Sequence, residues 1–292
     1  MNRSEQRAKA EYFLALHAGP SLLVLPNAWD VVSARIFARS PSLRALGTTS
    51  AGIAAVLGYP DGEVTPRAEM LEMVGRIARA VEVPLSADVE AGYGASSEAA
   101  AETASEVIAA GAVGLNLEDA WHGGESPLLP LEQQVERIEA IREVGEREGI
   151  PLVINARTDV YLREVGEPDG RLEETVRRGN AYSAAGADCV FVPDVTEEET
   201  IRRLVKELDS PLNVFAELES PPIAELERLG VRRLSIGPQA QRASFALTAR
   251  IAEELLERRD FRFISQTMPR AEVRRLLSPP DPARSRLASS PS

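Results

Sequence analysis

The sequence is poor in the residues that build disulfides and soft metal sites. Its 292 residues include one cysteine, Cys189, and two histidines, His17 and His122. A single cysteine excludes an intramolecular disulfide, and so few nitrogen and sulfur ligands nearly exclude a zinc site of the usual kind. His17 lies in a leading helical stretch and is interpreted as structural.

Long apolar runs and excess positive charge are also absent. No run approaches the roughly 20 residues that a membrane-spanning helix needs, and residues 1–13 lack the apolar core of a signal peptide. The formal net charge is -12, which disfavours nucleic acid and anionic membranes as partners. We therefore expect a cytoplasmic protein with neither kind of partner, in which any anionic ligand meets a local cation or arginine.

Short apolar runs alternate with amphipathic stretches along most of the chain. Most runs are continuously apolar, as expected for parallel strands that are buried on both faces, and glycines such as Gly111 and Gly149 end the helical patterns. This alternation predicts an α/β fold, a (β/α)8 TIM-type barrel. A doubly wound sheet would favour a glycine-rich turn after the first strand, which is missing. The eight runs are residues 21–27, 43–50, 83–90, 112–119, 151–159, 187–194, 211–217 and 231–237.

We predict one barrel domain over residues 1–277, with helical segments at both ends, and a disordered Pro- and Ser-rich tail over 278–292. Residues 250–277 contain more helical pattern than an eighth barrel helix requires. Apolar side chains in this segment and just before it predict a homo-oligomer, a tetramer or a dimer. These side chains are Phe245, Leu247, Phe261, Phe263 and Ile264.

Four carboxylates and one arginine follow the carboxyl ends of predicted strands, where the active site of such a barrel lies. They are Asp61, Asp88, Glu90, Glu118 and Arg157. Packed together, uncompensated acids would raise one another's pKa, whereas a hard cation such as Mg²⁺ prefers oxygen ligands and keeps several waters. We therefore predict a divalent metal site, with Arg157 free to hold a substrate carboxylate through a bidentate pair.

Neighbouring residues have structural interpretations beside functional ones. Asp119 is expected to point away from Glu118. Asp159 is expected to orient Arg157 or to begin a helix. Trp29 either belongs to the core or walls the pocket at the end of the first strand.

The ordered motifs resemble those of the isocitrate lyase / phosphoenolpyruvate mutase superfamily over roughly residues 20 to 255. No single motif is specific, but the set in this order is. "SADVEAGYG" (86–94) is similar to the family's D-A-D-x-G-Y-G segment. The other matching segments are "LPNAWDVVSA" (25–34), "TTSAG" (48–52), "GYPD" (58–61), "NLED" (116–119), "NARTD" (155–159) and "NAYSAAGADCVFVPD" (180–194).

The resemblance implies a barrel that uses Mg²⁺ (or Mn²⁺) and acts on small 2-oxo acids or their enol forms. It implies Asp88 as the direct metal ligand, with Asp61, Glu90 and Glu118 holding the waters of the ion. Glu90 replaces the family's aspartate and should still reach such a water. Relatives exchange a C-terminal helix between neighbouring subunits, so this chain is expected to do the same. The implied substrate-binding residues are Trp29, Ser50, Ala51, Gly52, Asp88, Arg157 and Asn213, with the backbone of 50–52 facing the carboxylate or oxyanion.

The loop after Glu118 departs from the family pattern. The lyases carry K-[KR]-C-G-H here, with a cysteine that acts as acid or base, and the mutases and phosphonopyruvate hydrolases carry a longer loop with lysine and asparagine. This chain reads "LEDAWHGGESPLLP" (117–130) instead. His122 is the candidate acid or base because its pKa suits that task, and a solvent-exposed structural histidine is the alternative. The candidate catalytic residues are Arg157, Glu118 and His122.

Three functions remain open at this stage. The leading hypothesis is an Mg²⁺-dependent carbon–carbon lyase or decarboxylase that acts on an oxaloacetate-like 2-oxo acid through a metal-stabilised enolate. The first alternative is a phosphoenolpyruvate or phosphonopyruvate mutase or hydrolase, which phosphate release would reveal. The second is a non-catalytic 2-oxo acid binding protein, which would bind tightly without forming a product.

Overall fold

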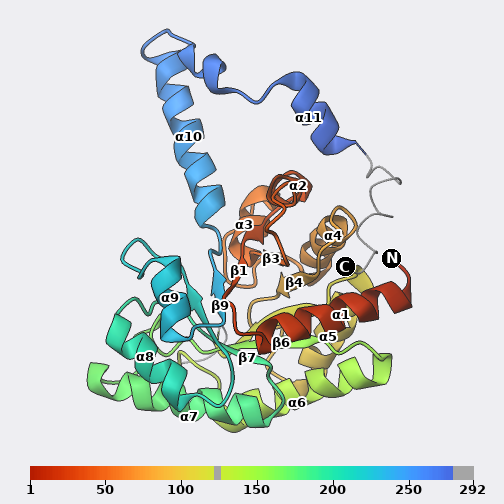
Figure 1. Cartoon of the computed structure of the whole chain (residues 1–292), viewed down its shortest axis with the longest axis vertical. Helices are drawn as coiled ribbons and strands as arrows, with labels where there is room; N and C mark the ends of the chain where they lie inside the picture. Colours follow the sequence, from red (N-terminus) through yellow and green to blue (C-terminus); the bar gives the residue numbers. More distant parts are fainter. Residues whose placement is uncertain (122–125, 279–292) are drawn as a thin grey trace. The chain divides into compact units, whose positions relative to one another are not determined.

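The computed structural model describes residues 1–121 and 126–278 (Figure 1). Residue contacts divide the chain into two units, Met1–Gln241 and Arg242–Ser292. The strands belong to the first unit. The assignment of residues 1–277 to one domain and the exchange of a C-terminal helix stay predictions, and most of the expected tail, residues 279–292, lies outside the described residues. None of the described helices is long and apolar enough to cross a membrane.

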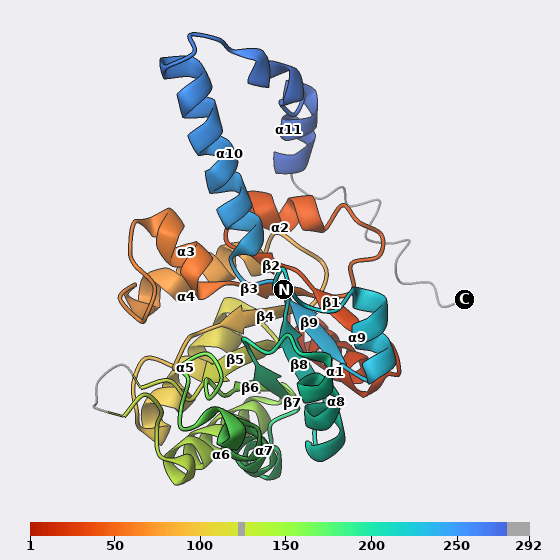
Figure 2. The same ribbon diagram turned by 90° about the vertical axis from the view of Figure 1, so that its left-hand side faces the viewer.

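All strands of the described residues form one parallel sheet in the order β1-β9-β8-β7-β6-β5-β4-β3-β2. The sheet is a nearly closed barrel, which confirms the predicted (β/α)8 fold. In Figure 2 the strand labels follow a ring, with helices α2 to α9 of the first unit outside it. The strands are β1 Leu23–Leu25, β2 Asn27–Ala28, β3 Leu46–Thr48, β4 Leu85–Asp88, β5 Gly114–Glu118, β6 Val153–Arg157, β7 Cys189–Val192, β8 Leu212–Phe215 and β9 Arg233–Ser235.

Helices follow the strands in the alternation that the sequence predicts. Gly111 and Gly149 end α5 and α6 with φ values of 97° and 68°, a left-handed conformation that favours glycine. The helices are α1 Arg3–Ala18, α2 Val31–Phe37, α3 Ser50–Leu57, α4 Arg67–Ala78, α5 Ser97–Ala110, α6 Leu131–Glu148, α7 Arg171–Ala184, α8 Glu198–Glu207, α9 Ile223–Leu229, α10 Gln239–Leu256 and α11 Arg270–Leu277, with 3-10 turns η1 Pro168–Gly170 and η2 Arg262–Gln266.

The first predicted strand is divided in two at Pro26. β1 pairs with β9 and β2 pairs with β3, so the two pieces connect the opposite ends of the sheet. The side chain of Asn27 holds this seam, because its Nδ2 donates to the Thr48 carbonyl at 2.8 Å while its Oδ1 accepts from the Ile236 and Gly237 amides at 2.9 Å each. Asn27 therefore replaces the ladder hydrogen bonds that a broken strand loses.

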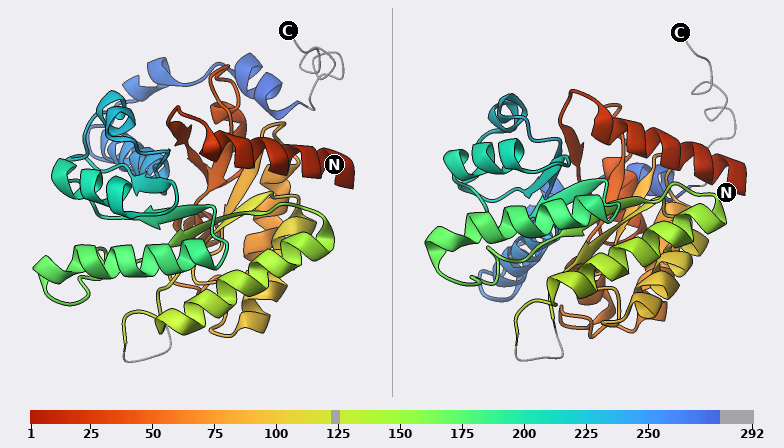
Figure 3. Two further views of the ribbon diagram at one scale, coloured as in Figure 1. Left: turned by 60° about the horizontal axis from the view of Figure 1, so that its bottom comes forward. Right: turned by 90° about the horizontal axis from the view of Figure 1, so that it is seen from below.

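Helix α1 packs against the barrel and contacts strand β6 (Figure 3). Its Phe13 is fully buried, and a Cβ on Gly114 of β5 would lie 2.8 Å from the Phe13 ring. Only glycine leaves room for this ring inside the strand layer. His17 packs edge-on against Phe13 with 4.7 Å between the ring centroids, which confirms that His17 is a buried structural residue.

Candidate active site

A cavity of about 160 Å³ opens at the carboxyl ends of the strands. At roughly 30 Å³ per water molecule, it has room for about five waters or one small organic acid. Residues from β3 to β6 and the loops after them contribute its acidic half, defined as Ser50, Asp61, Asp88, Asn116 and Arg157. Residues from β7 to β9 contribute its aromatic half, defined as Phe191, Pro193, Asp194, Phe215, Glu217 and Pro238.

Asp88 is the last residue of β4 and is held in one orientation. Its Oδ2 accepts from the Ser50 amide at 3.0 Å and from the Ser50 hydroxyl at 2.8 Å. Its own amide donates to Thr48 Oγ1 at 2.8 Å. Its Oδ1 is buried and has no hydrogen-bond partner among the described residues. A buried carboxylate oxygen without a donor is costly unless a ligand satisfies it.

Glu90 lies in a strained turn beside Asp88. The φ angle of Glu90 is 54°, and the nearby Glu63 and Tyr93 also have positive φ angles, 60° and 59°. Such backbone strain in non-glycine residues persists only where the surrounding structure enforces it, often at functional sites. Burial raises the pKa of Glu90 to about 8, and the charges of Asp88, Asp61 and Glu118 add to this despite a hydrogen bond from Glu63 that lowers it. These four predicted metal-site carboxylates therefore lie close enough to affect one another, but only Asp61 and Asp88 line the cavity.

Arg157 ends β6 between two carboxylates. Nε and Nη2 contact Asp159 at 2.6 and 3.0 Å, and Nη1 lies 2.7 Å from Glu118 Oε2. Burial by itself would lower the pKa of Arg157. The negative charges of Glu118 and Asp159 outweigh burial and raise this pKa. Asp159 thus orients Arg157, as expected. The guanidinium is less free than the sequence hypothesis assumed, because every nitrogen already contacts a carboxylate and only the remaining N–H groups can reach a ligand.

The oxygen atoms of the acidic half and of the neighbouring Glu90 suit a hard divalent cation. Asp88 Oδ1 and Glu90 Oε1 are both buried without partners among the described residues, and oxygen donors are what Mg²⁺ prefers. Within residues 1–121 and 126–278, no group of three or more His, Cys, Asp or Glu side chains could hold a metal ion between them. The residues therefore fit an ion with one direct carboxylate ligand and retained waters, not a closed protein cage.

Asp119 points away from Glu118, as expected, and lies outside the barrel interior. It is fully buried and accepts from Tyr182 Oη at 2.7 Å, Arg178 Nη1 at 3.2 Å and the Asp159 amide at 2.9 Å. Asp119 thereby ties α7 to the loop that carries Asp159, the carboxylate that orients Arg157.

The structure places the other predicted residues less close to the cavity. Trp29 packs against the core cluster, and a Cβ on Gly52 would lie 2.9 Å from the Trp29 Cβ. Neither Trp29 nor Gly52 is among the cavity-lining residues, whereas Ala51 is. Asn213 is fully buried, and its Nδ2 has no partner among the described residues. His122 lies outside the described residues.

Sequence reasoning missed Asn116 and the aromatic half. Asn116 stands two residues before Glu118 on β5, so the two side chains share the inner face of the barrel, and this spacing could have identified it. Phe191 and Phe215 lie in apolar runs and could not be distinguished from core residues by pattern alone.

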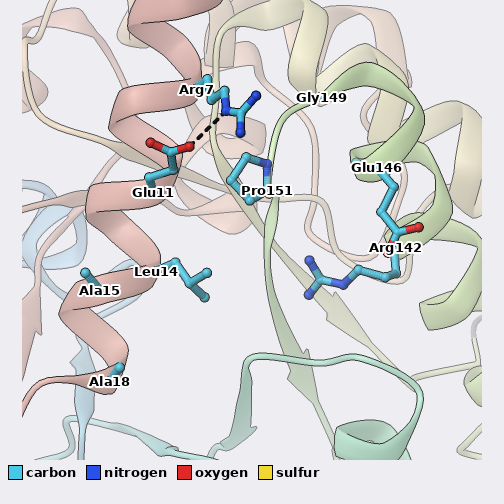
Figure 4. A pocket seen from close by; sticks show the side chains of 10 residues that line it. Arg7, Glu11, Leu14, Ala15, Ala18, Arg142, Glu146, Gly149 and Pro151 are labelled. Carbon is cyan, nitrogen blue, oxygen red and sulfur yellow. Dashed lines mark hydrogen bonds and ion pairs between the residues drawn. The ribbon is translucent and has the colours of Figure 1, made fainter.

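A larger hollow of about 800 Å³ lies between α1, the end of α6 and the segment before β6. Figure 4 shows its charged side chains, with Arg7 paired to Glu11 at 2.8 Å. Arg142 is directed to Asp188 at 2.6 Å. This hollow lies near the amino end of β6, at the opposite end of that strand from Arg157, and its Arg7, Glu11 and Arg142 side chains already have protein partners. The smaller cavity is therefore the candidate active site.

Comparison with known proteins identifies the family. The model of the phosphoenolpyruvate phosphomutase family matches residues 13–256. The chain belongs to this family. The resemblance to the isocitrate lyase / phosphoenolpyruvate mutase superfamily is thereby confirmed.

Individual family members differ in their named activities. A solved structure from Burkholderia cenocepacia, provisionally named a lyase/mutase, is 34% identical with a TM-score of 0.88 and covers 95% of this chain and 98% of its own. The chain is 30% identical over 254 residues to an oxaloacetate decarboxylase of Chromohalobacter salexigens, covering 85% of this chain and 84% of that protein. It is 28% identical over 216 residues to a 2-methylisocitrate lyase of Bacillus subtilis, covering 72% and 68%.

Proposed function

We propose that this protein is a metal-dependent carbon–carbon lyase or decarboxylase that acts on a small 2-oxo acid of the oxaloacetate type. The observation that carries the proposal is Asp88 Oδ1, which has no hydrogen-bond partner among the described residues and belongs to a 160 Å³ cavity that Arg157 also lines. The cavity size favours a small acid. The similarity to an oxaloacetate decarboxylase supports the same substrate class.

Mg²⁺ or Mn²⁺ is the proposed ion. Asp88 would hold it directly, and Asp61, Glu90 and Glu118 would hold its waters. When bound, such an ion polarises the 2-oxo group and stabilises the negative charge of an enolate by several kcal/mol. Ser50 fixes Asp88 for this role through two hydrogen bonds to Oδ2, which leave Oδ1 directed to the ligand.

Arg157 would hold the substrate carboxylate next to the metal through the N–H groups that Glu118 and Asp159 leave unused. Asp159 keeps the guanidinium plane in place, and Asp119 keeps Asp159 in place. Ser50 and Ala51 line the same side of the cavity. We therefore assign the C1 carboxylate and the C2 oxo oxygen of the substrate to the acidic half of the cavity.

The aromatic half would receive the group that leaves. Among the described cavity-lining residues, Arg157 is the one arginine or lysine, so a distal carboxylate would face Phe191 and Phe215 without a cation. Loss of CO₂ breaks the C3–C4 bond, leaves its electron pair in the enolate, and removes charge from this half. A wall of aromatic rings with the carboxylates Asp194 and Glu217 beside them, and without a cation, thus destabilises the charged ground state relative to the transition state. His122 is the proposed donor of the proton that C3 then takes up.

Phosphorus chemistry fits this cavity less well. A phosphonate or phosphate group is normally held by several cationic or N–H donors. The described aromatic half instead presents Asp194 and Glu217, and the loop 122–125 contains no lysine or arginine.

A substrate panel tests the proposal. Oxaloacetate, 2-methylisocitrate, phosphonopyruvate and phosphoenolpyruvate would each be incubated with the protein and Mg²⁺, and the products followed by proton and phosphorus NMR. We expect metal-dependent formation of pyruvate from oxaloacetate above the uncatalysed rate. Phosphate release would favour the mutase or hydrolase alternative, and tight binding without any product would favour the non-catalytic alternative.

We further propose that the chain forms a homo-oligomer, as the sequence predicts, and that it is cytoplasmic. In the described part of the second unit, large apolar side chains are exposed, with Leu256 75% and Phe261 65% accessible. Such surface favours association. Light scattering should give a mass of two or four chains, and a stable 31.6 kDa monomer would contradict this.

A further inference from the structure

We propose that Asn116 is a specificity-determining residue on the floor of the cavity, where its side-chain N–H donates to an acceptor oxygen of the bound acid. This inference rests on the proposed function and names one determinant of its substrate class. Asn116 lies in β5 in register with Asp88 on one side and Asn155 on the other. It lines the cavity and is 7% exposed.

Two donors decide which way the Asn116 amide points. Its Oδ1 accepts from Asn155 Nδ2 at 2.6 Å and from Arg233 Nη2 at 3.3 Å. An amide can be turned over by exchanging its oxygen and nitrogen, but a guanidinium has donors only. The atom that faces Arg233 is therefore the oxygen, and the Asn116 nitrogen faces elsewhere. No protein acceptor for this nitrogen is found in the described residues, so its N–H groups remain for a ligand.

Arg233 is itself held rigidly. It is 1% exposed, lies over the Phe13 ring at 5.9 Å, and contacts Ser86 Oγ at 3.4 Å and His17 Nε2 at 3.5 Å. His17 Nδ1 lies 2.9 Å from the Phe13 carbonyl, which can only accept, so Nδ1 carries the proton and Nε2 is an acceptor. Arg233 is thus a positioning residue that connects α1 to the floor of the cavity.

A fixed donor selects ligands by chemistry rather than by size. A 2-oxo, enolate or carboxylate oxygen accepts from Asn116, whereas an amide or ammonium nitrogen at the same place opposes it with a second donor. Sites built for one hydrogen-bonding partner reject an isosteric analogue that cannot make the bond. The structure therefore favours ligands with oxygen at this position over nitrogen analogues of the same shape.

In oxamate an NH₂ group replaces one carboxylate oxygen of oxalate, which also lowers the charge from −2 to −1, so the effect of Asn116 is measured as the change of the oxalate preference between variants. Calorimetry with Mg²⁺ present would give the ratio of their affinities for wild type, Asn116→Leu and Asn116→Asp. Leucine removes the donor without adding charge, and aspartate places an acceptor there. We expect oxalate to be preferred by wild type, the preference to fall about 10-fold or more in Asn116→Leu, and further in Asn116→Asp.

Arg233→Met is the second variant, in which Asn116 is unchanged but its amide can turn over. We expect the oxalate preference to fall here too, whether or not the Asn116 variants fold. An unchanged preference in a folded Asn116→Leu or in Arg233→Met would overturn the inference. If wild type did not bind oxalate in a metal-dependent way, the proposed function would fail instead.

Discussion

The acidic and aromatic halves of one cavity are built in different ways. In the acidic half, hydrogen bonds and ion pairs hold Asp88 and Arg157 in fixed orientations and leave single atoms for a ligand. The aromatic half instead offers the rings of Phe191 and Phe215, with Asp194 and Glu217 beside them and no lysine or arginine among its described residues. The difference separates two tasks, since the first half can bind a metal and a 2-oxo group while the second leaves a departing group poorly solvated.

Removing Asp88 should have the largest effect. Asp88→Ala deletes the one oxygen proposed to bind the metal directly, and we expect metal-dependent turnover to fall more than about 100-fold, since even indirect ligand partners contribute 10- to 100-fold. Asp194→Ala is the matched control, because it removes a carboxylate from the aromatic half and should leave Mg²⁺ affinity unchanged. Equal losses of Mg²⁺ affinity in calorimetry of the two variants would remove the distinction between the halves.

His122 should have the next largest effect. If it gives the proton to C3, His122→Gln should lower turnover by roughly 10²-fold and leave Mg²⁺ and oxalate affinities nearly unchanged. Glu125→Gln, in the same loop, is the control. Unchanged turnover in His122→Gln would leave a metal-bound water or another residue as the proton source.

A cation in the aromatic half should have a smaller effect. Phe215→Lys would stabilise the distal carboxylate of the bound substrate, so we expect kcat for oxaloacetate to fall about 10-fold without a rise in KM. Phe215→Leu keeps the wall apolar and serves as the control. A higher kcat in Phe215→Lys would show that this half does not act by withholding charge.

His17 is buried next to Arg233 and does not line the cavity, so we expect its replacement to affect stability rather than chemistry. Burial lowers its pKa to about 4, and Arg233 adds to this. The folded-state pKa of His17 therefore lies below its unfolded value of 6.5, so burial of the neutral ring contributes fully to the free energy of unfolding above pH 6.5. This contribution is lost as the pH falls toward 4, and it amounts to at most about 3 kcal/mol. Thermal unfolding between pH 7.5 and 4.5 should show a smaller loss in His17→Gln than in wild type; equal losses would contradict this.

The barrel and the acidic half were predictable for the same reason. Parallel strands that are buried on both faces appear in the sequence as continuous apolar runs. Charged residues at the ends of these runs, such as Asp88 and Glu118, are therefore easy to recognise. The carboxyl ends of all strands meet at one rim, so these acids had to converge.

Other features leave no such signal. The break at Pro26 is invisible in a run that reads as one strand. The adjacent Arg232 and Arg233 look alike in the sequence, yet Arg232 reaches the Pro20 carbonyl at the surface at 2.6 Å, whereas Arg233 points into the barrel. Only the pairing register decides which of two neighbours faces inward.

The most direct test is a crystal structure with Mn²⁺ and oxalate, with the metal located by its anomalous signal. We expect a peak bonded to Asp88 Oδ1, with Asp61, Glu90 and Glu118 reached through waters and oxalate placed between the ion and Arg157. A peak elsewhere, or oxalate bound without metal at this cavity, would contradict the assignment of the acidic half.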